Sequence, residues 1–247
     1  MRTSSHRTAL HRPSDIKVSD WDRIGVQYAR VRDTRRDTVF PLLWDQIRHL
    51  DARTVLDYGG GDGTFSLARP SKLSVAISIF EPSPMLRSIA AQNTSGLKHI
   101  RVTGEPKSLR PNEFDVVTLN AVWMSLATKS ACIALLRKIH GYLKKDGVLL
   151  ASVTHPCFRD VVYSTFRTTF RNEWYLQSGR SFQVRMSDGS NEVILEDTHW
   201  KLSDMFCQLA DAHFVVRRAW EVPDIKLGRK RHRGVPWLVL ECLKLKP

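Results

Sequence analysis

The spacing of apolar residues along the chain predicts helices that alternate with strands. Apolar positions three or four residues apart are typical of helices, and they occur within residues 20–50, 64–68, 84–92, 128–143 and 202–212. Short continuous apolar runs predict buried strands, and these cover residues 54–56, 73–80, 98–103, 113–120, 148–153, 214–221 and 236–245. Alternation of this kind indicates an α/β fold.

The turn after the first predicted strand is dense in glycine. Asp57 closes the strand, and Gly59, Gly61 and Gly63 follow at alternate positions. Glycine permits positive φ and lets a ligand approach the main chain, and the free N–H groups of a helix start favour electron-rich groups. A dinucleotide fingerprint would need glycine where Thr64 stands, and the P-loop spacing is absent. The pattern D-x-G-x-G-x-G is therefore either a different nucleotide-type cradle or a tight connection.

This pattern resembles motif I of the class I S-adenosylmethionine (SAM) dependent methyltransferases. Three further segments resemble that family, at residues 81–86 (EPSPML), 114–117 (FDVV) and 143–150 (LKKDGVLL). The resemblance covers residues 50–155 motif by motif and 200–246 in outline. It implies one α/β domain with a Rossmann-like, seven-stranded, mostly parallel sheet, an antiparallel last strand and helices on both faces.

The resemblance also implies SAM as the cofactor and S-adenosyl-L-homocysteine as the product. Asp57 and the backbone of Gly59, Gly61 and Gly63 would hold the methionine part. Glu81 closes the second strand 24 residues after Asp57. A carboxylate at that place can accept hydrogen bonds from both ribose hydroxyls.

Four further site residues follow from the same resemblance. Met85 would pack on the adenine, and Glu105 would accept a hydrogen bond from the adenine amino group. Tyr28 would approach the methionine end and help to place the acceptor, which makes it a catalytic candidate as well. Glu105 stands where the family has Asp. Asn120 ends the fourth strand, where open α/β sheets bind ligands, and should lie near the methyl group. Plain core packing for Met85 and Tyr28, and a surface turn for Glu105, are the alternatives.

The acceptor side is predicted around His155 and an insertion at residues 158–200. A branch of small-molecule methyltransferases resembles the His-Pro-Cys-Phe stretch that begins at His155. Because imidazole titrates near neutrality, His155 is a candidate general base; acceptor positioning and loop fixing are the alternatives, and no further metal ligands are grouped with it. The insertion has a hairpin signal at Asp188-Gly189. We interpret it as an acceptor-site cap that leads to a second candidate base, His199.

The formal net charge of +13 is the unusual feature of the composition. Residues 1–36 contain nine Arg or Lys against four Asp, and residues 226–233 contain five basic residues and no acid. Such patches bind polyanions or are simply solvated, and we favour solvation because no aromatic-studded RNA-binding motif is present. Residues 1–19 predict a flexible basic arm ahead of a methyltransferase domain at 20–247.

Other features of the composition narrow the setting of the protein. No apolar run reaches the length of a membrane span. Four cysteines lack the spacings of disulfide frameworks or C-x-x-C pairs, which favours a reducing, cytoplasmic environment.

These observations predict methyl transfer from SAM to a nitrogen or oxygen of a small molecule. An RNA acceptor held by the basic surface is one alternative, although the Asn-Pro-Pro-Tyr type signature of base-amino methyltransferases is absent after the fourth strand. A SAM-binding subunit without catalysis is the other. Binding that weakens steeply with salt would indicate RNA, and formation of S-adenosylhomocysteine would exclude the inactive subunit.

Overall fold

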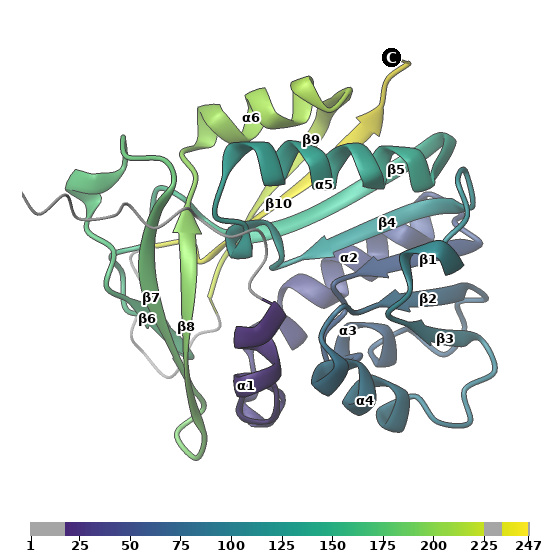
Figure 1. Cartoon of the computed structure of the whole chain (residues 1–247), viewed down its shortest axis with the longest axis horizontal. Helices are drawn as coiled ribbons and strands as arrows, with labels where there is room; N and C mark the ends of the chain where they lie inside the picture. Colours follow the sequence, from purple (N-terminus) through teal and green to yellow (C-terminus); the bar gives the residue numbers. More distant parts are fainter. Residues whose placement is uncertain (1–17, 225–233, 247) are drawn as a thin grey trace, which may run out of the picture.

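A computed structural model describes residues 18–224 and 234–246, and its main element is a seven-stranded sheet (Figure 1). The strand order is β3-β2-β1-β4-β5-β10-β9. The strands are β1 (Thr54–Tyr58), β2 (Ala76–Phe80), β3 (Ile100–Thr103), β4 (Phe114–Asn120), β5 (Leu143–Thr154), β9 (Phe214–Val222) and β10 (Trp237–Lys244). Neighbours from β3 to β5 are parallel, whereas β10 runs antiparallel to both β5 and β9. The predicted fold class is therefore confirmed.

The helices pack in two groups beside this sheet. The first contains α1 (Val18–Arg30), α2 (Val39–His49), α3 (Thr64–Leu67) and α4 (Pro84–Asn93). Within it, α4 contacts both α1 and α3, and Trp44 of α2 stacks on Phe65 of α3 with ring centroids 4.7 Å apart. The second group is α5 (Lys129–Tyr142) and α6 (Leu202–Asp211), which pack on each other and on β4, β5 and β9. Strands covered in this way are apolar on both faces, and every residue of β1 after Thr54 is buried.

The residues inserted between β5 and α6 form a second, antiparallel sheet. Its strands are β6 (Phe166–Thr168), β7 (Arg180–Ser187) and β8 (Glu192–His199). The predicted hairpin is confirmed, with Gly189 at φ 90° in the turn between β7 and β8. The carboxylate of Asp188 accepts the N–H of Arg32 at 2.8 Å, which fastens the hairpin tip to the end of α1. As Figure 1 shows, α1 lies between this small sheet and α4, and it contacts both.

Some element bounds differ from the predicted ones. β2 begins at Ala76 rather than at residue 73, because Leu73 donates its N–H to the carbonyl of Pro70 at 2.9 Å and closes a turn. β5 begins at Leu143 and continues through the predicted turn at residues 144–147, where its pairing with β4 shifts at a bulge. Short 3-10 helices connect other elements: η1 (Thr34–Arg36), η2 (Pro106–Ser108), η3 (Trp123–Ser125) and η4 (Asn172–Trp174).

Two segments predicted from the sequence lie wholly or largely outside the described residues. The arm at 1–19 is described only from residue 18 onward, and the basic segment 226–233 lies wholly outside the described residues. Among the described helices, none is both long enough and apolar enough to cross a bilayer.

Candidate functional site

The loop between β1 and α3 is shaped by its glycines. Gly59, Gly61 and Gly63 have φ angles of 70°, 58° and 80°, a region that residues with side chains rarely adopt. A Cβ on Gly59 would lie 2.6 Å from the side chain of Val122, so that position requires glycine for packing. A Cβ on Gly61 would meet only the ring of Tyr28, 4.0 Å away. Gly61 therefore leaves space beside the main chain, facing Tyr28.

Asp57 lies buried at the end of β1, below this loop. Its carboxylate accepts hydrogen bonds from the hydroxyls of Ser66 at 3.0 Å and Thr118 at 3.1 Å. Burial raises the pKa of Asp57 to about 6, although the two hydroxyl bonds act in the opposite direction. The acid is therefore held rigidly in place at the carboxyl end of the sheet.

Glu81 follows β2 and is hydrogen-bonded to the same loop. One oxygen accepts the N–H of Gly61 and the other accepts the N–H of Ser83, both at 2.8 Å. Burial raises the pKa of Glu81 to about 7, against the effect of these two bonds. A carboxylate oxygen has two acceptor sites, so these bonds do not saturate Glu81, although its side chain is 5 % exposed and lines neither of the cavities described below.

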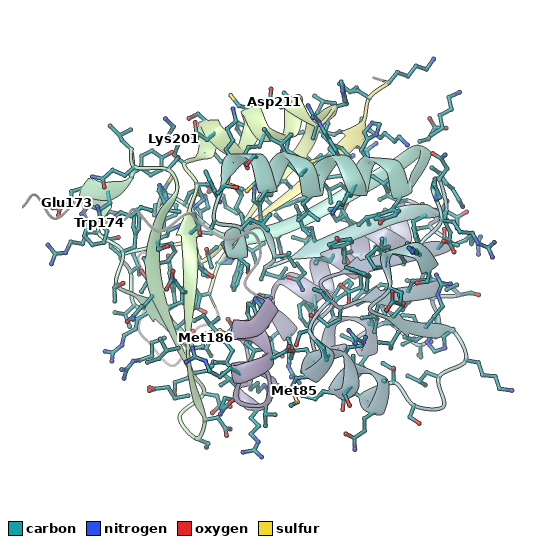
Figure 2. The ribbon with its side chains drawn as sticks, viewed as in Figure 1. Met85, Glu173, Trp174, Met186, Lys201 and Asp211 are labelled. Carbon is teal, nitrogen blue, oxygen red and sulfur yellow. The ribbon has the colours of Figure 1, made fainter. Side chains whose placement is uncertain are left out.

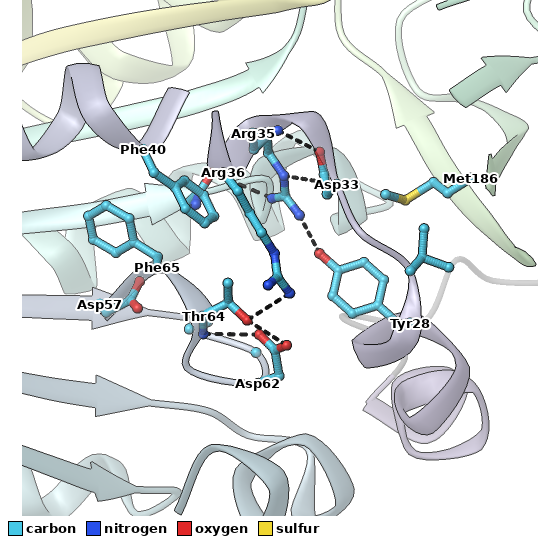
Figure 3. A pocket seen from close by; sticks show the side chains of 15 residues that line it. Tyr28, Asp33, Arg35, Arg36, Phe40, Asp57, Asp62, Thr64, Phe65 and Met186 are labelled. Carbon is cyan, nitrogen blue, oxygen red and sulfur yellow. Dashed lines mark hydrogen bonds and ion pairs between the residues drawn. The ribbon is translucent and has the colours of Figure 1, made fainter. Parts of the chain in front are cut away.

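A cavity opens between the glycine loop, α1 and η1, and we call it the loop cavity (Figure 3). Five predicted site residues line it: Tyr28, Asp57, Gly59, Gly61 and Asn120. Figure 3 shows Arg36 reaching from η1 toward the loop, where it donates to the hydroxyl of Thr64 at 3.3 Å. That hydroxyl donates to Asp62 at 2.6 Å. The cavity thus presents a cation and a carboxylate on one side.

Arg35 of η1 connects the walls of the loop cavity. Its guanidinium donates to Asp33 at 2.5 Å, to the hydroxyl of Tyr28 at 2.5 Å and to Asn120 at 3.5 Å. Burial acts to lower the pKa of Arg35, but the neighbouring Asp33 and Tyr28 outweigh it and leave the pKa above its usual value. Arg35 is therefore a charged, buried link between α1, η1 and β4.

A second cavity lies between the two sheets, and we call it the inter-sheet cavity. It shares four lining residues with the loop cavity: Tyr28, Asp33, Arg35 and Met186. Its other walls are largely apolar and aromatic, namely Trp21, Ala121, Met124, Phe166, Val184, Leu195 and Trp237, with Thr154 and Asp197 as polar members. Figures 2 and 3 show Met186 of β7 on the side of α1 that faces this cavity. The linked residues Tyr28, Arg35 and Asp33 therefore stand where the two cavities adjoin.

Of the residues predicted to bind the cofactor, Gly63, Glu81, Met85 and Glu105 do not line either cavity. Met85 is 40 % exposed at the start of α4, and its N–H donates to the carboxylate of Asp22 in α1 at 3.3 Å. Figure 2 shows Met85 beside α1, away from Met186. Glu105 is exposed and precedes η2. Their adenine-binding roles stay predictions.

The two candidate bases are buried and also lie outside the linings of both cavities. Nδ1 of His155 accepts the N–H of Cys157 at 3.2 Å, which assigns the ring proton to Nε2, 3.2 Å from Glu221. Burial lowers the pKa of His155. Nε2 of His199 lies 2.7 Å from the carbonyl oxygen of Tyr175, and burial lowers the pKa of His199 to about 4. Their roles as bases stay predictions, and for His155 this geometry favours loop fixing.

Sequence reasoning missed five charged residues of the cavity walls: Asp33, Arg35, Arg36, Asp62 and Asp197. The first three were counted only as part of a basic N-terminal region. Their only signal in the sequence is their place between two amphipathic segments, which does not by itself predict a position in the site. The signal of Asp197 is strand periodicity, since apolar residues precede it at alternate positions and a period of two directs it to the buried face.

Comparison with known proteins connects this site to a family. The family described as "Methyltransferase domain" matches residues 29–194, a range that contains the glycine loop, both strand-end acids and most of the small sheet. No curated protein matches the chain significantly.

Solved structures of similar fold carry related descriptions. The CcbJ methyltransferase of Streptomyces caelestis superimposes with a TM-score of 0.66 at 13% identity, covering 91% of this chain and 97% of that one. An S-adenosylmethionine-dependent methyltransferase of Clostridium acetobutylicum gives 0.62 at 14% identity, covering 92% and 97%. The 1,6-didemethyltoxoflavin-N1-methyltransferase of Burkholderia thailandensis, with bound 1,6-didemethyltoxoflavin and S-adenosylhomocysteine, gives 0.61 at 17% identity, covering 94% and 88%. At these identities the likeness concerns the fold.

Proposed function

Because the chain belongs to the methyltransferase domain family, we propose that it transfers the methyl group of SAM to a nitrogen or oxygen of a small molecule. The observation that carries the proposal is the pair of adjoining cavities. One lies on the glycine loop, the other has apolar and aromatic walls, and both include Tyr28 and Arg35. Group transfer requires two reactants side by side in fixed orientation, and adjoining cavities meet that requirement.

The residues of the loop cavity fit SAM. The space that a Cβ on Gly61 would occupy is free of protein atoms. In this proposal Glu81, which does not line the cavity but accepts the N–H of Gly61, also accepts from the ribose hydroxyls. The methionine end of SAM carries a carboxylate and an ammonium group. Arg36 offers the charge opposite to the carboxylate, and Asp57 and Asp62 offer the charge opposite to the ammonium.

The reactivity of SAM, the methyl donor, determines which tasks are left to the protein. SAM brings a methyl group bound to a sulfonium, which is already electrophilic. The remaining task is to hold the acceptor atom in line and close, and to exclude water. Tyr28 and Asn120 line the loop cavity beside the linked Arg35, which makes them positioning residues in this proposal. A base is needed only where the acceptor loses a proton.

Several observations favour a small-molecule acceptor over RNA. The inter-sheet cavity is lined mainly by apolar and aromatic side chains, as small-molecule sites are, and the small sheet is the cap in this proposal. The name of the Burkholderia enzyme describes methylation of a ring nitrogen in a compact molecule. RNA methylation by the basic surface and a non-catalytic SAM-binding role are the alternatives. A cytoplasmic location, which the unpaired cysteines favour, belongs to the same proposal.

The proposal is tested by incubating the full chain with SAM and pooled small amines, N-heterocycles and phenols. Acceptor-dependent formation of S-adenosylhomocysteine, measured by mass spectrometry, is the expected result. Binding of SAM with no product from any pool would favour the non-catalytic subunit, and product with RNA alone would favour an RNA acceptor.

Replacing His155 by alanine should lower stability more than turnover. The bonds to Cys157 and Glu221 hold the loop after β5, and their loss should cost about 1–2 kcal/mol, which corresponds to roughly 2–8 °C in melting temperature for a chain of this size. Thermal unfolding and turnover are measured on the same preparations, with His49→Ala on the exposed side of α2 as the control. A fall in turnover of about 10²-fold at unchanged melting temperature would instead identify a general base.

A further inference from the structure

One acidic side chain interrupts the otherwise apolar face that the small sheet turns toward the inter-sheet cavity. Along β8, Val193, Leu195 and Asp197 are buried at alternate positions and share that face. On β7, Phe182 stands directly opposite Asp197 in the register. Asp197 is 5 % exposed and lines the cavity.

The carboxylate of Asp197 has no partner within the described protein. Across residues 18–224 and 234–246 it makes no hydrogen bond and no ion pair within 4.0 Å. Arg159 is near enough to attract it, but the two side chains do not form an ion pair. One guanidinium nitrogen of Arg159 donates to the carbonyl of Thr154 at 3.3 Å, whereas its Nε and Nη1 are buried and have no hydrogen-bond partner among the described residues. A buried carboxylate without a hydrogen bond is costly, and because Asp197 lines the cavity, a ligand that enters it can supply a donor.

Two further polar groups of this cavity also lack a partner within the described part of the chain. The hydroxyl of Thr154 and the indole N–H of Trp237 are buried and lack a hydrogen-bond partner among the described residues. Both residues line the same cavity as Asp197. Its lining therefore combines a strong acceptor with unpaired polar groups inside aromatic walls, which are suited to contacts with a flat ring.

We propose that Asp197 accepts a hydrogen bond from a ring N–H of the methyl acceptor, which makes the acceptor a compact, mainly apolar nitrogen heterocycle. This inference rests on the proposed methyl transfer and defines its substrate class. An acceptor that offers only ether or carbonyl oxygen leaves the carboxylate without a donor. A phosphate or carboxylate group is repelled by it, which disfavours RNA as the occupant of this cavity.

The charge state of Asp197 agrees with this role. Burial raises the pKa of Asp197 to about 6, with Arg159 and Arg35 acting in the opposite direction. At pH 7.5 the carboxylate is therefore ionised and accepts hydrogen bonds only.

The test compares two probes that differ in one atom, indole and benzofuran, by ligand-observed NMR titration of the full chain at pH 7.5 without SAM. A hydrogen bond to a buried carboxylate should make indole bind about tenfold more tightly than benzofuran. Asp197→Leu should reduce that ratio to about one, because no acceptor remains for the N–H. Asp197→Asn keeps the size of the side chain, should reduce the ratio partly, and serves where the leucine variant does not fold. Glu173→Leu, at the exposed outer end of the small sheet (Figure 2), should keep the wild-type ratio.

Three results would show that Asp197 does not bind a ring N–H. Equal affinity of the two probes for the wild type, no detectable binding of either at millimolar concentration, or an unchanged ratio in both Asp197 variants would overturn the inference. Calorimetric titration of SAM into the same samples tests the proposed methyl transfer separately from the role of Asp197. A wild type that prefers indole but does not bind SAM would refute the proposed methyl transfer, and it would leave Asp197 only as a residue that binds an N–H heterocycle.

Discussion

Replacing Glu81 by alanine should weaken the binding of SAM strongly while leaving the fold intact. In the proposed complex the carboxylate accepts from both ribose hydroxyls, and hydrogen bonds to a charged group contribute about 1.5–3 kcal/mol each. Because 1.4 kcal/mol corresponds to a factor of ten, we expect a loss of about 100-fold or more. The substitution also removes the acceptor of the Gly61 N–H, so the loop itself becomes less ordered. Isothermal titration calorimetry measures the loss.

The control for this experiment is Glu173→Ala. Glu173 is exposed and lies at the outer end of the small sheet (Figure 2), so this variant should bind SAM as the wild type does. A Glu81→Ala variant with a wild-type circular dichroism spectrum and wild-type affinity would contradict the assignment of Glu81 to the ribose.

Glu81 should also make SAM binding depend on pH. Burial raises the pKa of this carboxyl to about 7 in the ligand-free protein. The ionised form is the better acceptor, so affinity should rise as the pH increases through about 7 and then level off. The contribution of Glu81 to the stability of the ligand-free protein has the opposite sign: it is fully present below the unfolded pKa near 4.5 and is lost as the pH rises through about 7. In Glu81→Gln both dependences should be reduced, which calorimetry and urea unfolding between pH 5.5 and 8.5 can measure.

The main sheet and the position of Glu81 were predictable because local patterns determine them. Buried parallel strands are short apolar runs, and a βαβ unit brings the ends of two neighbouring strands to one edge of the sheet. The start of β5 was not predictable in this way. Lys144, Lys145, Asp146 and Gly147 have the composition of a turn, but Leu143 pairs with Phe114 across a bulge, and Lys144 forms an ion pair with Asp115 at 2.7 Å. Tertiary contacts there override local propensity.

The site was predictable only where one segment makes it. The backbone geometry of the glycine loop depends on the glycines of one segment, so the sequence alone predicts it. Arg35 gains its importance from partners in other elements, Tyr28 in α1 and Asn120 in β4, and sequence alone shows only a basic residue. His155 illustrates the reverse, because its place after a central strand suggests catalysis although its ring is hydrogen-bonded to Cys157 and Glu221. His155 lies one residue beyond the end of β5. The alternation of side chains in a strand no longer applies there, so the sequence does not predict where its side chain points.

Replacing Arg35 by methionine should impair stability and both binding sites together. Methionine retains much of the packing volume, but Asp33, which is 6 % exposed, would lose the guanidinium that neutralises it. Removing one partner of a buried ion pair costs about 3–5 kcal/mol, or roughly 6–20 °C in melting temperature for a chain of this size. The hydroxyl of Tyr28 would lose its donor as well. Urea unfolding and differential scanning calorimetry measure this loss.

The neighbouring arginine supplies a matched control for the same substitution. Arg36 is exposed and reaches the glycine loop through Thr64, so Arg36→Met should leave the melting temperature almost unchanged and weaken SAM binding alone. If Arg35 instead served only as a solvated charge, the two variants would unfold alike. The double variant Asp33→Asn, Arg35→Met distinguishes the mechanism further, because removing both charges should restore much of the lost stability. Even where stability is restored, SAM and indole titrations should remain weaker than in the wild type, since Tyr28 and Asn120 would no longer be held by the guanidinium at the junction of the two cavities.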